Sequence, residues 1–385
     1  MGGLARWRDH VDKLLRFNHM TMTLGAEPFR AGAEPGGAGL RRGRQGASAT
    51  ATLQYAFDST QHFPEPFLTA APRFNSSFEP SLRHLPCVLF LHGSDPGGFD
   101  VARWFAGGLA HVHRLRNPLM PGRFGSYSVY NVQDPQFAVP MPPLGVLSVS
   151  RPGYLESSPP PHAPTFQAQA ATVARLVESL RIPSVHVVAH STAAPIALEM
   201  AALAGFRRRV RSIALVSPRL APPRPLQRAA ERARMLVPEW ARTRAAYNAL
   251  ARPADDAYFV RAVAEICGAA SADEIADDPA MARLYEGIGV FFSHWGARRP
   301  GALADWRMWG RLDRRAWGLV RAPILCLTAS PADEEAARAA LVTTRAAPEF
   351  GRLSGAGRML FPLASTSRLC LGFVYRHHHE HCARP

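Results

Sequence analysis

Ser191 lies where two sequence patterns meet. The β-branched run 185–188 predicts a short buried strand, and the Ala- and Leu-rich run that follows residue 193 predicts a helix. A serine in the sharp turn between a strand and a helix forms a nucleophile elbow, which holds its hydroxyl exposed above the sheet. The two backbones pass so close that residues 189 and 193 must be small, and both are alanine. Such a hydroxyl can attack a carbonyl carbon once a base takes its proton; the alternative is a serine that only caps the helix.

Other polar residues also follow predicted strands. Predicted strands cover 51–57, 87–91, 145–149, 185–188, 210–216, 323–327 and 350–353, and helices such as 101–109 and 165–180 alternate with them. This alternation predicts a parallel sheet with helices on both faces, in which ligands bind at the carboxyl ends of the strands. The residues that follow the strands are His92-Gly93, Arg151 to Tyr154, Ser191, Ser217 and Asp333. We therefore expect them to meet at one edge of the sheet.

The composition divides the chain into four parts. Residues 1–48 are rich in Gly, Ala and Arg and are expected to be a poorly ordered extension. Segments 49–218 and 319–375 carry the strand pattern and are expected to build one mostly parallel, doubly wound α/β core. Segment 219–318 is expected to be a helical insertion with several Pro breaks, and 376–385 a His-rich tail after the last helix.

Several motifs, in this order, resemble the α/β-hydrolase superfamily, in its branch of serine hydrolases with a helical lid. The matching segments are His92-Gly93-Ser94-Asp95-Pro96-Gly97-Gly98, similar to the branch's His-Gly-x-Pro-Gly oxyanion loop; Arg151-Pro152-Gly153-Tyr154, similar to its Arg-Pro-Gly-Tyr-Gly turn; His190-Ser191-Thr192-Ala193, similar to its His-Ser-x-Gly elbow; and Ala304-Asp305 through Trp317-Gly318 to Pro323, similar to its return from lid to core. The resemblance covers residues 50–370 and departs from the family at Leu155 and Ala193, where glycine is expected. It makes 219–318 the lid.

The resemblance implies catalytic residues in the order Ser, Asp, His. Ser191 would be the nucleophile and Asp333 the acid. The backbone N–H groups of Ser94 and Thr192 would form the oxyanion hole, which needs no particular side chain. For Asp333 the alternative is a residue that begins a helix. The resemblance implies no cofactor and no metal.

Arg358 stands where the resemblance implies the catalytic histidine. An arginine does not lose its proton near neutral pH, so it cannot act as the base. The histidines that follow Asp333 are His377, His378, His379 and His381, in the predicted tail. Three interpretations of this cluster stay open: a solvated C-terminus, a substitute base and a metal site.

The sequence therefore predicts a serine hydrolase, similar to esterases and lipases, that acts on a small apolar ester or amide through Ser191. The alternative is a catalytically impaired relative that binds a small ligand or a protein, with Arg358 suited to an anionic group. A lyase or an acyltransferase on the same fold is a further alternative.

Composition and charge restrict the partners. The net charge is +15, but Lys13 is the one lysine, and the arginines are scattered rather than gathered as a nucleic-acid surface requires. We therefore expect a small-molecule partner and no nucleic acid. No apolar run is long enough to cross a membrane. Five cysteines without CxxC spacing favour a reducing, cytoplasmic location, although 4–17 resembles an organelle-targeting helix. The oligomeric state stays open.

Overall fold

The computed structural model describes residues 20–24, 51–60, 85–94, 97–116, 142–159, 164–250, 256–277, 285, 288, 292, 294–353, 355–356 and 364–382. Eight strands of this part form one sheet, in the order β1-β2-β4-β3-β5-β6-β7-β8. They are β1 (Met20–Leu24), β2 (Ala51–Ser59), β3 (Cys87–Leu91), β4 (Gly145–Val149), β5 (Val185–His190), β6 (Val210–Val216), β7 (Ile324–Thr328) and β8 (Glu349–Arg352). β2 runs antiparallel to β1 and β4, and the strands from β4 to β8 are parallel to their neighbours.

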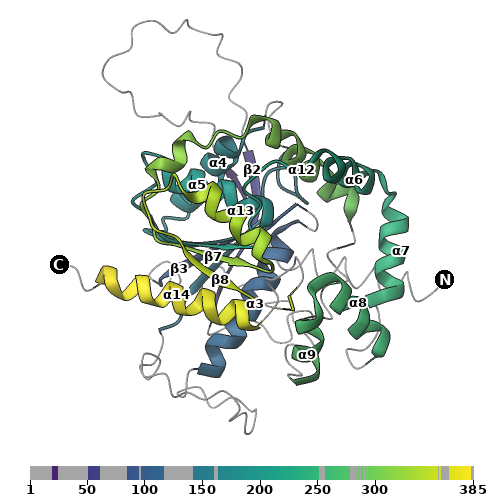
Figure 1. Cartoon of the computed structure of the whole chain (residues 1–385). Coiled ribbons are helices and arrows are strands. Elements are labelled where there is room, and N and C mark those ends of the chain that lie inside the picture. The colour runs from purple at the N-terminus through teal and green to yellow at the C-terminus, as the bar shows by residue number, and fades with distance from the viewer. Residues whose placement is uncertain are drawn as a thin grey trace, which may run out of the picture.

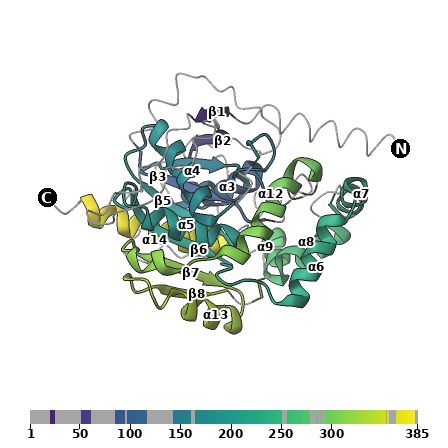
Figure 2. The same ribbon diagram turned by 90° about the horizontal axis from the view of Figure 1, so that it is seen from above.

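Helices cover both faces of the sheet (Figures 1 and 2). On one face α3 (Phe99–Arg116) packs against α14 (Ala364–Cys382), and on the other α4 (Phe166–Ser179) packs against α5 (Ala194–Ala202). Each face has its own apolar core. Because β3, β4 and β5 are covered on both faces, every residue in them is buried, which explains their continuous apolar runs. The predicted fold class, a mostly parallel doubly wound α/β sheet, is confirmed.

Between β6 and β7 the chain forms helices. They are α6 (Pro225–Leu236), α7 (Glu239–Leu250), α8 (Ala257–Cys267), α9 (Ala269–Asp277) and α12 (Trp295–Met308), followed by the short helices η3 (Trp309–Arg311) and η4 (Arg315–Leu319). α13 (Pro331–Leu341) then connects β7 to β8. α6 and α7 lie at the outer edge of the molecule, whereas α12 lies next to the core (Figure 2). The helical pattern in 219–318 is thus found in the described part of that segment.

Two elements differ from the sequence predictions. Residues 20–24 pair with β2 as strand β1, inside the segment expected to be a poorly ordered extension. Their Met-Thr-Met-Thr-Leu alternation is a strand signal that the Gly- and Arg-rich composition around it outweighed. The last helix was expected to end near residue 375, but α14 continues to Cys382. His377, His378, His379 and His381 therefore lie on this helix and not in a tail that follows it.

The strand register aligns the carboxyl ends of the parallel strands. Leu91 pairs with both Val149 and Ala189, and Val216 pairs with both His190 and Leu327. The residues after β3, β4, β5 and β6 therefore meet at one edge, as the sequence predicts.

Candidate active site

Ser191 connects β5 to a single 3₁₀ turn, η2 (Ser191–Ala193), which leads directly into α5. Its φ is +53°, a left-handed conformation that is costly for any residue with a side chain. Ala189 and Ala193 are completely buried, as expected where strand and helix backbones cross. The predicted strand–turn–helix geometry around Ser191 is therefore present. Within the described part of the chain the Ser191 hydroxyl makes no hydrogen bond.

Gly93 lies directly against Ser191. A Cβ atom at position 93 would be 3.1 Å from Ser191 Cβ and 3.0 Å from His190 Nδ1. These distances are too short for most side chains, so glycine is what allows the loop after β3 to approach the loop after β5. The approach also brings Ser94 beside Thr192.

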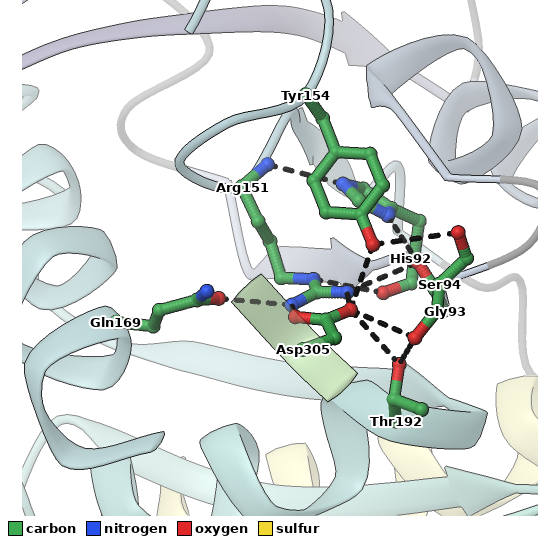
Figure 3. Close-up of polar contacts among 8 residues, drawn as sticks. All are labelled: His92, Gly93, Ser94, Arg151, Tyr154, Gln169, Thr192 and Asp305. Atoms are coloured by element: carbon green, nitrogen blue, oxygen red, sulfur yellow. Dashed lines mark hydrogen bonds and ion pairs between the residues drawn. The ribbon is translucent and has the colours of Figure 1, made fainter. Parts of the chain in front are cut away.

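The hydroxyls of Ser94 and Thr192 are 2.6 Å apart (Figure 3). These are the two residues predicted to form the oxyanion hole, and the structure brings them together through their side chains. Both hydroxyls lie near Asp305 Oδ2, Ser94 at 2.8 Å and Thr192 at 3.4 Å. The shorter contact favours Ser94 as the donor to Asp305 and as the acceptor of the Thr192 proton. The two strand ends are thus joined to each other and to α12, which carries Asp305.

Asp305 is the centre of this buried network. Arg151 binds it with both terminal nitrogens, at 2.8 Å to Oδ1 and 2.6 Å to Oδ2, and the Tyr154 hydroxyl donates to Oδ2 at 2.7 Å (Figure 3). Burial alone would lower the pKa of Arg151, but the paired carboxylate of Asp305 outweighs it and raises that pKa. Burial, followed by the negative charge of Asp305, raises the pKa of Tyr154. The network is therefore an ion pair with a neutral phenol.

The remaining donors of Arg151 are also satisfied. Its Nε donates to the His92 carbonyl, and the terminal nitrogens also donate to the Gly93 carbonyl and to Gln169 Oε1, at distances from 2.9 to 3.0 Å. This side chain consequently fixes the backbone at 92–93, which precedes the candidate oxyanion residue Ser94. Arg151 is completely buried, so its role is to hold this backbone in place.

His92 is held neutral in this arrangement. Its Nδ1–H donates to the Gly93 carbonyl at 2.7 Å, and Nε2 accepts from the Arg151 backbone N–H at 3.0 Å. A carbonyl can only accept and an amide N–H can only donate, so the contacts assign the proton to Nδ1. Burial, followed by the positive charge of Arg151, lowers the pKa of His92 well below its ordinary value. His92 is thus a structural histidine rather than a proton shuttle.

A proline in α12 creates the docking site for the turn after β4. Pro300 has no N–H, and near it the helix uses backbone groups for contacts outside itself. Gly301 N donates to the Gly153 carbonyl, and Leu155 N donates to the Ala297 carbonyl, both at 2.7 Å. In an unbroken helix the 301 N–H and the 297 carbonyl would bond to each other. The turn 153–155 is therefore joined to α12 by two backbone hydrogen bonds.

A second buried ion pair anchors the same helix. Arg298 on α12 binds both oxygens of Asp100 on α3, at 2.9 and 2.7 Å, and also donates to the Gly97 carbonyl. α12 thus carries two buried charged residues, Arg298 and Asp305, about two turns apart. Both contact the loop that follows β3. The position of α12 relative to the core is fixed by these contacts.

Asp333 lies at the beginning of α13, where its side chain is exposed. The Ser330 hydroxyl donates to Asp333 Oδ2 at 2.6 Å and accepts from the Asp333 backbone N–H at 3.2 Å. These contacts belong to a helix start. Within the described residues the carboxylate contacts neither Ser191 nor a histidine. Arg358 lies outside the described residues.

Two histidines of α14 have described side chains, His377 and His378, and the contacts given for them are with residues other than Ser191. His377 is buried against Phe373 and lies 4.0 Å from Glu349, and the ring of His378 packs on His186 in β5. Among the described residues, no group of three or more His, Cys, Asp or Glu side chains is placed to hold a metal ion.

Sequence reasoning did not assign Asp305 to the site. The signal was present, because Ala304-Asp305 was part of the segment that resembles the return from lid to core. Asp305 lies in the predicted helical insertion and Arg151 follows a predicted strand, so the two could have been proposed as an ion pair. Pro300 is visible in the sequence, but the sequence does not show that the neighbouring Ala297 carbonyl and Gly301 N–H bond to the turn 153–155.

The parallel strands from β4 to β8, the left-handed φ of Ser191 after β5 and the glycine beside it are typical of the α/β-hydrolase fold, and the chain has this fold. The family model described as alpha/beta hydrolase fold matches residues 119–271. No curated protein has a sequence that matches the chain. No described helix is long and apolar enough to cross a membrane.

Solved structures are similar at low sequence identity. An alpha/beta hydrolase fold protein from Nakamurella multipartita has a TM-score of 0.51 and 18% identity, with 85% of this chain and 96% of that chain covered. A thermophilic esterase from Thermogutta terrifontis has a TM-score of 0.48 and 17% identity, with 93% and 99% covered. An enol-lactonase from Burkholderia xenovorans has a TM-score of 0.48 and 12% identity, with 84% and 96% covered. At such identities the likeness concerns the fold.

Proposed function

We propose that the protein is a serine hydrolase that cleaves a small apolar ester or amide, with the Ser191 hydroxyl as nucleophile. The observation that carries this proposal is the φ of +53° at Ser191, at the carboxyl end of β5. A serine that only caps a helix ordinarily has an extended backbone conformation, so a left-handed φ at this position favours the nucleophile elbow. At a nucleophile elbow the same strain presents the hydroxyl to a substrate.

In this proposal the backbone N–H groups of Ser94 and Thr192 stabilise the oxyanion. Donors of this kind act most strongly when they are fixed before the reaction begins. The 2.6 Å contact between the two hydroxyls and the contact of Ser94 with Asp305 support such a fixed arrangement. Arg151, which binds the carbonyls of residues 92 and 93, supports it from the other side.

The proposed reaction has two halves. Ser191 Oγ bonds to the substrate carbonyl carbon while a base takes its proton, and the bond to the leaving alcohol or amine breaks as that group receives the proton. Water then attacks the acyl-enzyme in the same way and releases the carboxylic acid and free Ser191. Asp333 is the proposed acid because it follows β7 in the chain. Helices between 219 and 318 are proposed to cover the substrate.

A second candidate function is ligand binding without turnover. It is favoured by the Asp333 carboxylate, whose contact is with Ser330 at a helix start. It is also favoured by Arg358 at the sequence position expected for the base. The fold and the site would then bind a small molecule or a protein, with Ser191 as a contact rather than a nucleophile.

Hydrolysis of p-nitrophenyl butyrate by the purified full chain separates the two functions. We expect turnover that falls at least about a thousandfold in S191A, because the nucleophile is then missing. Ser217 also has a left-handed φ, +45°, at the end of β6, so S217A is the matched control and should retain activity. Equal activity in S191A would contradict the proposal. An inactive wild type that a methyl-ketone analogue of butyrate stabilises against heat would support the second function.

The variant R358H tests whether residue 358 occupies the position of the catalytic base. If the residue at 358 faces Ser191, a histidine there supplies a group that can accept the proton near neutral pH, and ester hydrolysis should rise. An unchanged rate in a folded R358H protein would place the base elsewhere. Such a result would not bear on the role of Ser191, which the S191A variant tests.

A further inference from the structure

The outer face of α6 is apolar although it faces solvent. Leu226 is 86% exposed and Leu236 is 64% exposed, and the alanines 229, 230 and 233 between them are exposed as well. Spacings of three and four residues place these side chains on one side of a helix. Val237 and Trp240, which is 71% exposed, follow at the junction with α7. We call Leu226, Ala230, Ala233, Leu236, Val237 and Trp240 the outer stripe.

The opposite side of α6 is the one that packs on the protein. Met235 is buried and belongs to a small apolar cluster with Trp295 and Ala302 of α12. The guanidinium of Arg228 lies over the ring of Trp306, also on α12, 5.0 Å from the ring centre. On a helical projection with 100° per residue, these inward residues lie opposite Leu226 and Ala233. The outer stripe is therefore a second apolar face and not the edge of the buried one.

The concentration of exposed apolar surface here is unusual for this protein. Among the described residues eight large apolar side chains are exposed, and four of them fall between 226 and 240. Isolated exposed leucines need no explanation, whereas a contiguous apolar patch marks an interaction surface. In Figures 1 and 2, α6 and α7 occupy the outer rim of the molecule, away from the sheet. The stripe is therefore accessible to a large, flat partner.

The charges beside the stripe are positive. Arg232 and Arg234 are exposed and lie on its two flanks in the helical projection, and exposed Arg244 follows one turn after Trp240. The two nearby acids are engaged elsewhere. Glu231 binds Arg219 at 2.5 Å, and the Glu239 carboxylate accepts from the Gly296 backbone N–H at 3.0 Å. An apolar band with an exposed arginine on either flank thus faces outward.

We propose that the outer stripe docks on the surface of an anionic phospholipid bilayer. An apolar helix face flanked by arginines lies in the plane of a membrane interface, where the apolar residues enter the acyl boundary and the cations meet the phosphates. Tryptophan favours the same depth, because its ring is apolar and its N–H is polar. α6 would lie flat on the membrane, with the rest of the protein on the aqueous side.

The charges favour a lipid surface over a second copy of the chain. A twofold contact through this face would place the same patch of both copies together. The arginines that flank one stripe would then lie near the arginines of the other, and like charges repel. An anionic surface instead meets every arginine with an opposite charge, and each arginine near such a surface strengthens binding.

Co-sedimentation of the full chain with lipid vesicles tests the proposal. We expect binding to vesicles of phosphatidylglycerol and phosphatidylcholine in equal parts, and much weaker binding to phosphatidylcholine alone. L226E/L236E should abolish binding to the mixed vesicles, because two charges then enter the apolar boundary. V342E/L369E is the matched control, since it adds the same two charges at exposed apolar residues on other parts of the protein, the end of α13 and α14. It should bind like the wild type.

A charge-reversal pair tests the flanking arginines. R232E/R234E should weaken binding by about 30-fold or more at low salt. R207E/R208E changes the net charge equally at two exposed arginines away from α6, and it should weaken binding far less. All of these positions are on the surface, so circular dichroism and the melting temperature should match the wild type.

Three results would overturn the proposal. One is a wild type that does not bind the mixed vesicles. Another is binding that L226E/L236E and R232E/R234E reduce no more than their controls do. The third is a wild-type dimer in sedimentation velocity that L226E/L236E converts to a monomer, because the stripe would then be covered by a second copy. None of these experiments depends on the role of Ser191.

Discussion

The hydroxyls of Ser94 and Thr192 lie 2.6 Å apart, although 98 residues separate them in the chain. Two neighbouring parallel strands, β3 and β5, deliver them to the same edge of the sheet. Gly93 makes the close approach sterically feasible, and Asp305 of α12 accepts a hydrogen bond from the Ser94 hydroxyl. An element of the helical insertion therefore completes the loop geometry around Ser191.

Replacing Asp305 should destabilise the fold strongly. D305A leaves the buried guanidinium of Arg151 without its carboxylate, and such an uncompensated charge costs about 3–5 kcal/mol. The free energy of unfolding from urea denaturation measures this loss. The double variant R151M/D305L removes both charges, so its loss should be smaller than that of D305A. A double variant less stable than D305A would show that the bonds of Arg151 to the carbonyls of residues 92 and 93 contribute more than the cost of its unpaired charge.

A methyl group at Gly301 should disturb the same contact. Its Cβ would be 2.1 Å from the Tyr154 ring, so α12 or the ring must move, at a cost of about 1–3 kcal/mol. The matched control is G310A, because a Cβ at 310 would meet no described atom within 4 Å. Thermal unfolding should show a lower melting temperature for G301A and an unchanged or slightly higher one for G310A. Equal melting temperatures would mean that α12 does not pack tightly on the turn.

The sequence determined the sheet well, because its signals are local. Buried parallel strands have short continuous apolar runs in the sequence. The strands predicted at 87–91, 145–149 and 210–216 have the same bounds as β3, β4 and β6. The expected meeting of strand-end residues followed from the topology of parallel sheets. The strained φ of Ser191 was also implied, since a strand leads directly into a helix there.

The missed features depend on contacts between distant segments. The pairing of Arg151 with Asp305 spans 154 residues and depends on how α12 is set against the core. The neutral state of His92 depends on which groups surround its two ring nitrogens, and no local pattern gives that. The continuation of α14 through four histidines runs against their modest helix propensity, and packing against Phe373 and β5 stabilises it.

The variant D333N distinguishes the proposed acid from a helix-start residue. If Asp333 orients the base, turnover of p-nitrophenyl butyrate should fall by about a hundredfold or more, while KM stays nearly constant. If the residue serves only the start of α13, stability should fall by about 1 kcal/mol or less and turnover should persist. S330A removes the partner of the Asp333 carboxylate and controls for the helix start. A wild-type rate in D333N would remove Asp333 from the proposed mechanism.

Stability should depend on the protonation of Glu199, on α5. Burial raises the pKa of Glu199 to about 7, although the hydrogen bond from Trp317 Nε1 lowers it in part. The folded state then binds the proton more tightly than the unfolded chain does. The resulting stabilisation is complete below pH 4.5 and is lost as the pH rises through about 7.

E199Q tests this dependence, since its amide oxygen can still accept from Trp317 while it carries no charge. At pH 8 the variant should be more stable than the wild type by about 1–3 kcal/mol, and the difference should vanish near pH 5. E335Q, at an exposed position of α13, should follow the wild type at every pH. A constant difference between E199Q and the wild type from pH 5 to 8 would contradict the raised pKa.

Labelling with a fluorophosphonate tests the central claim most directly, because the probe reacts with an activated serine hydroxyl and needs no knowledge of the substrate. Peptide mass spectrometry of the labelled full chain locates the adduct. The account predicts one adduct on Ser191, its loss in S191A and its retention in S217A. A wild type that stays unlabelled, or an adduct that persists in S191A, would contradict the claim that Ser191 is the nucleophile.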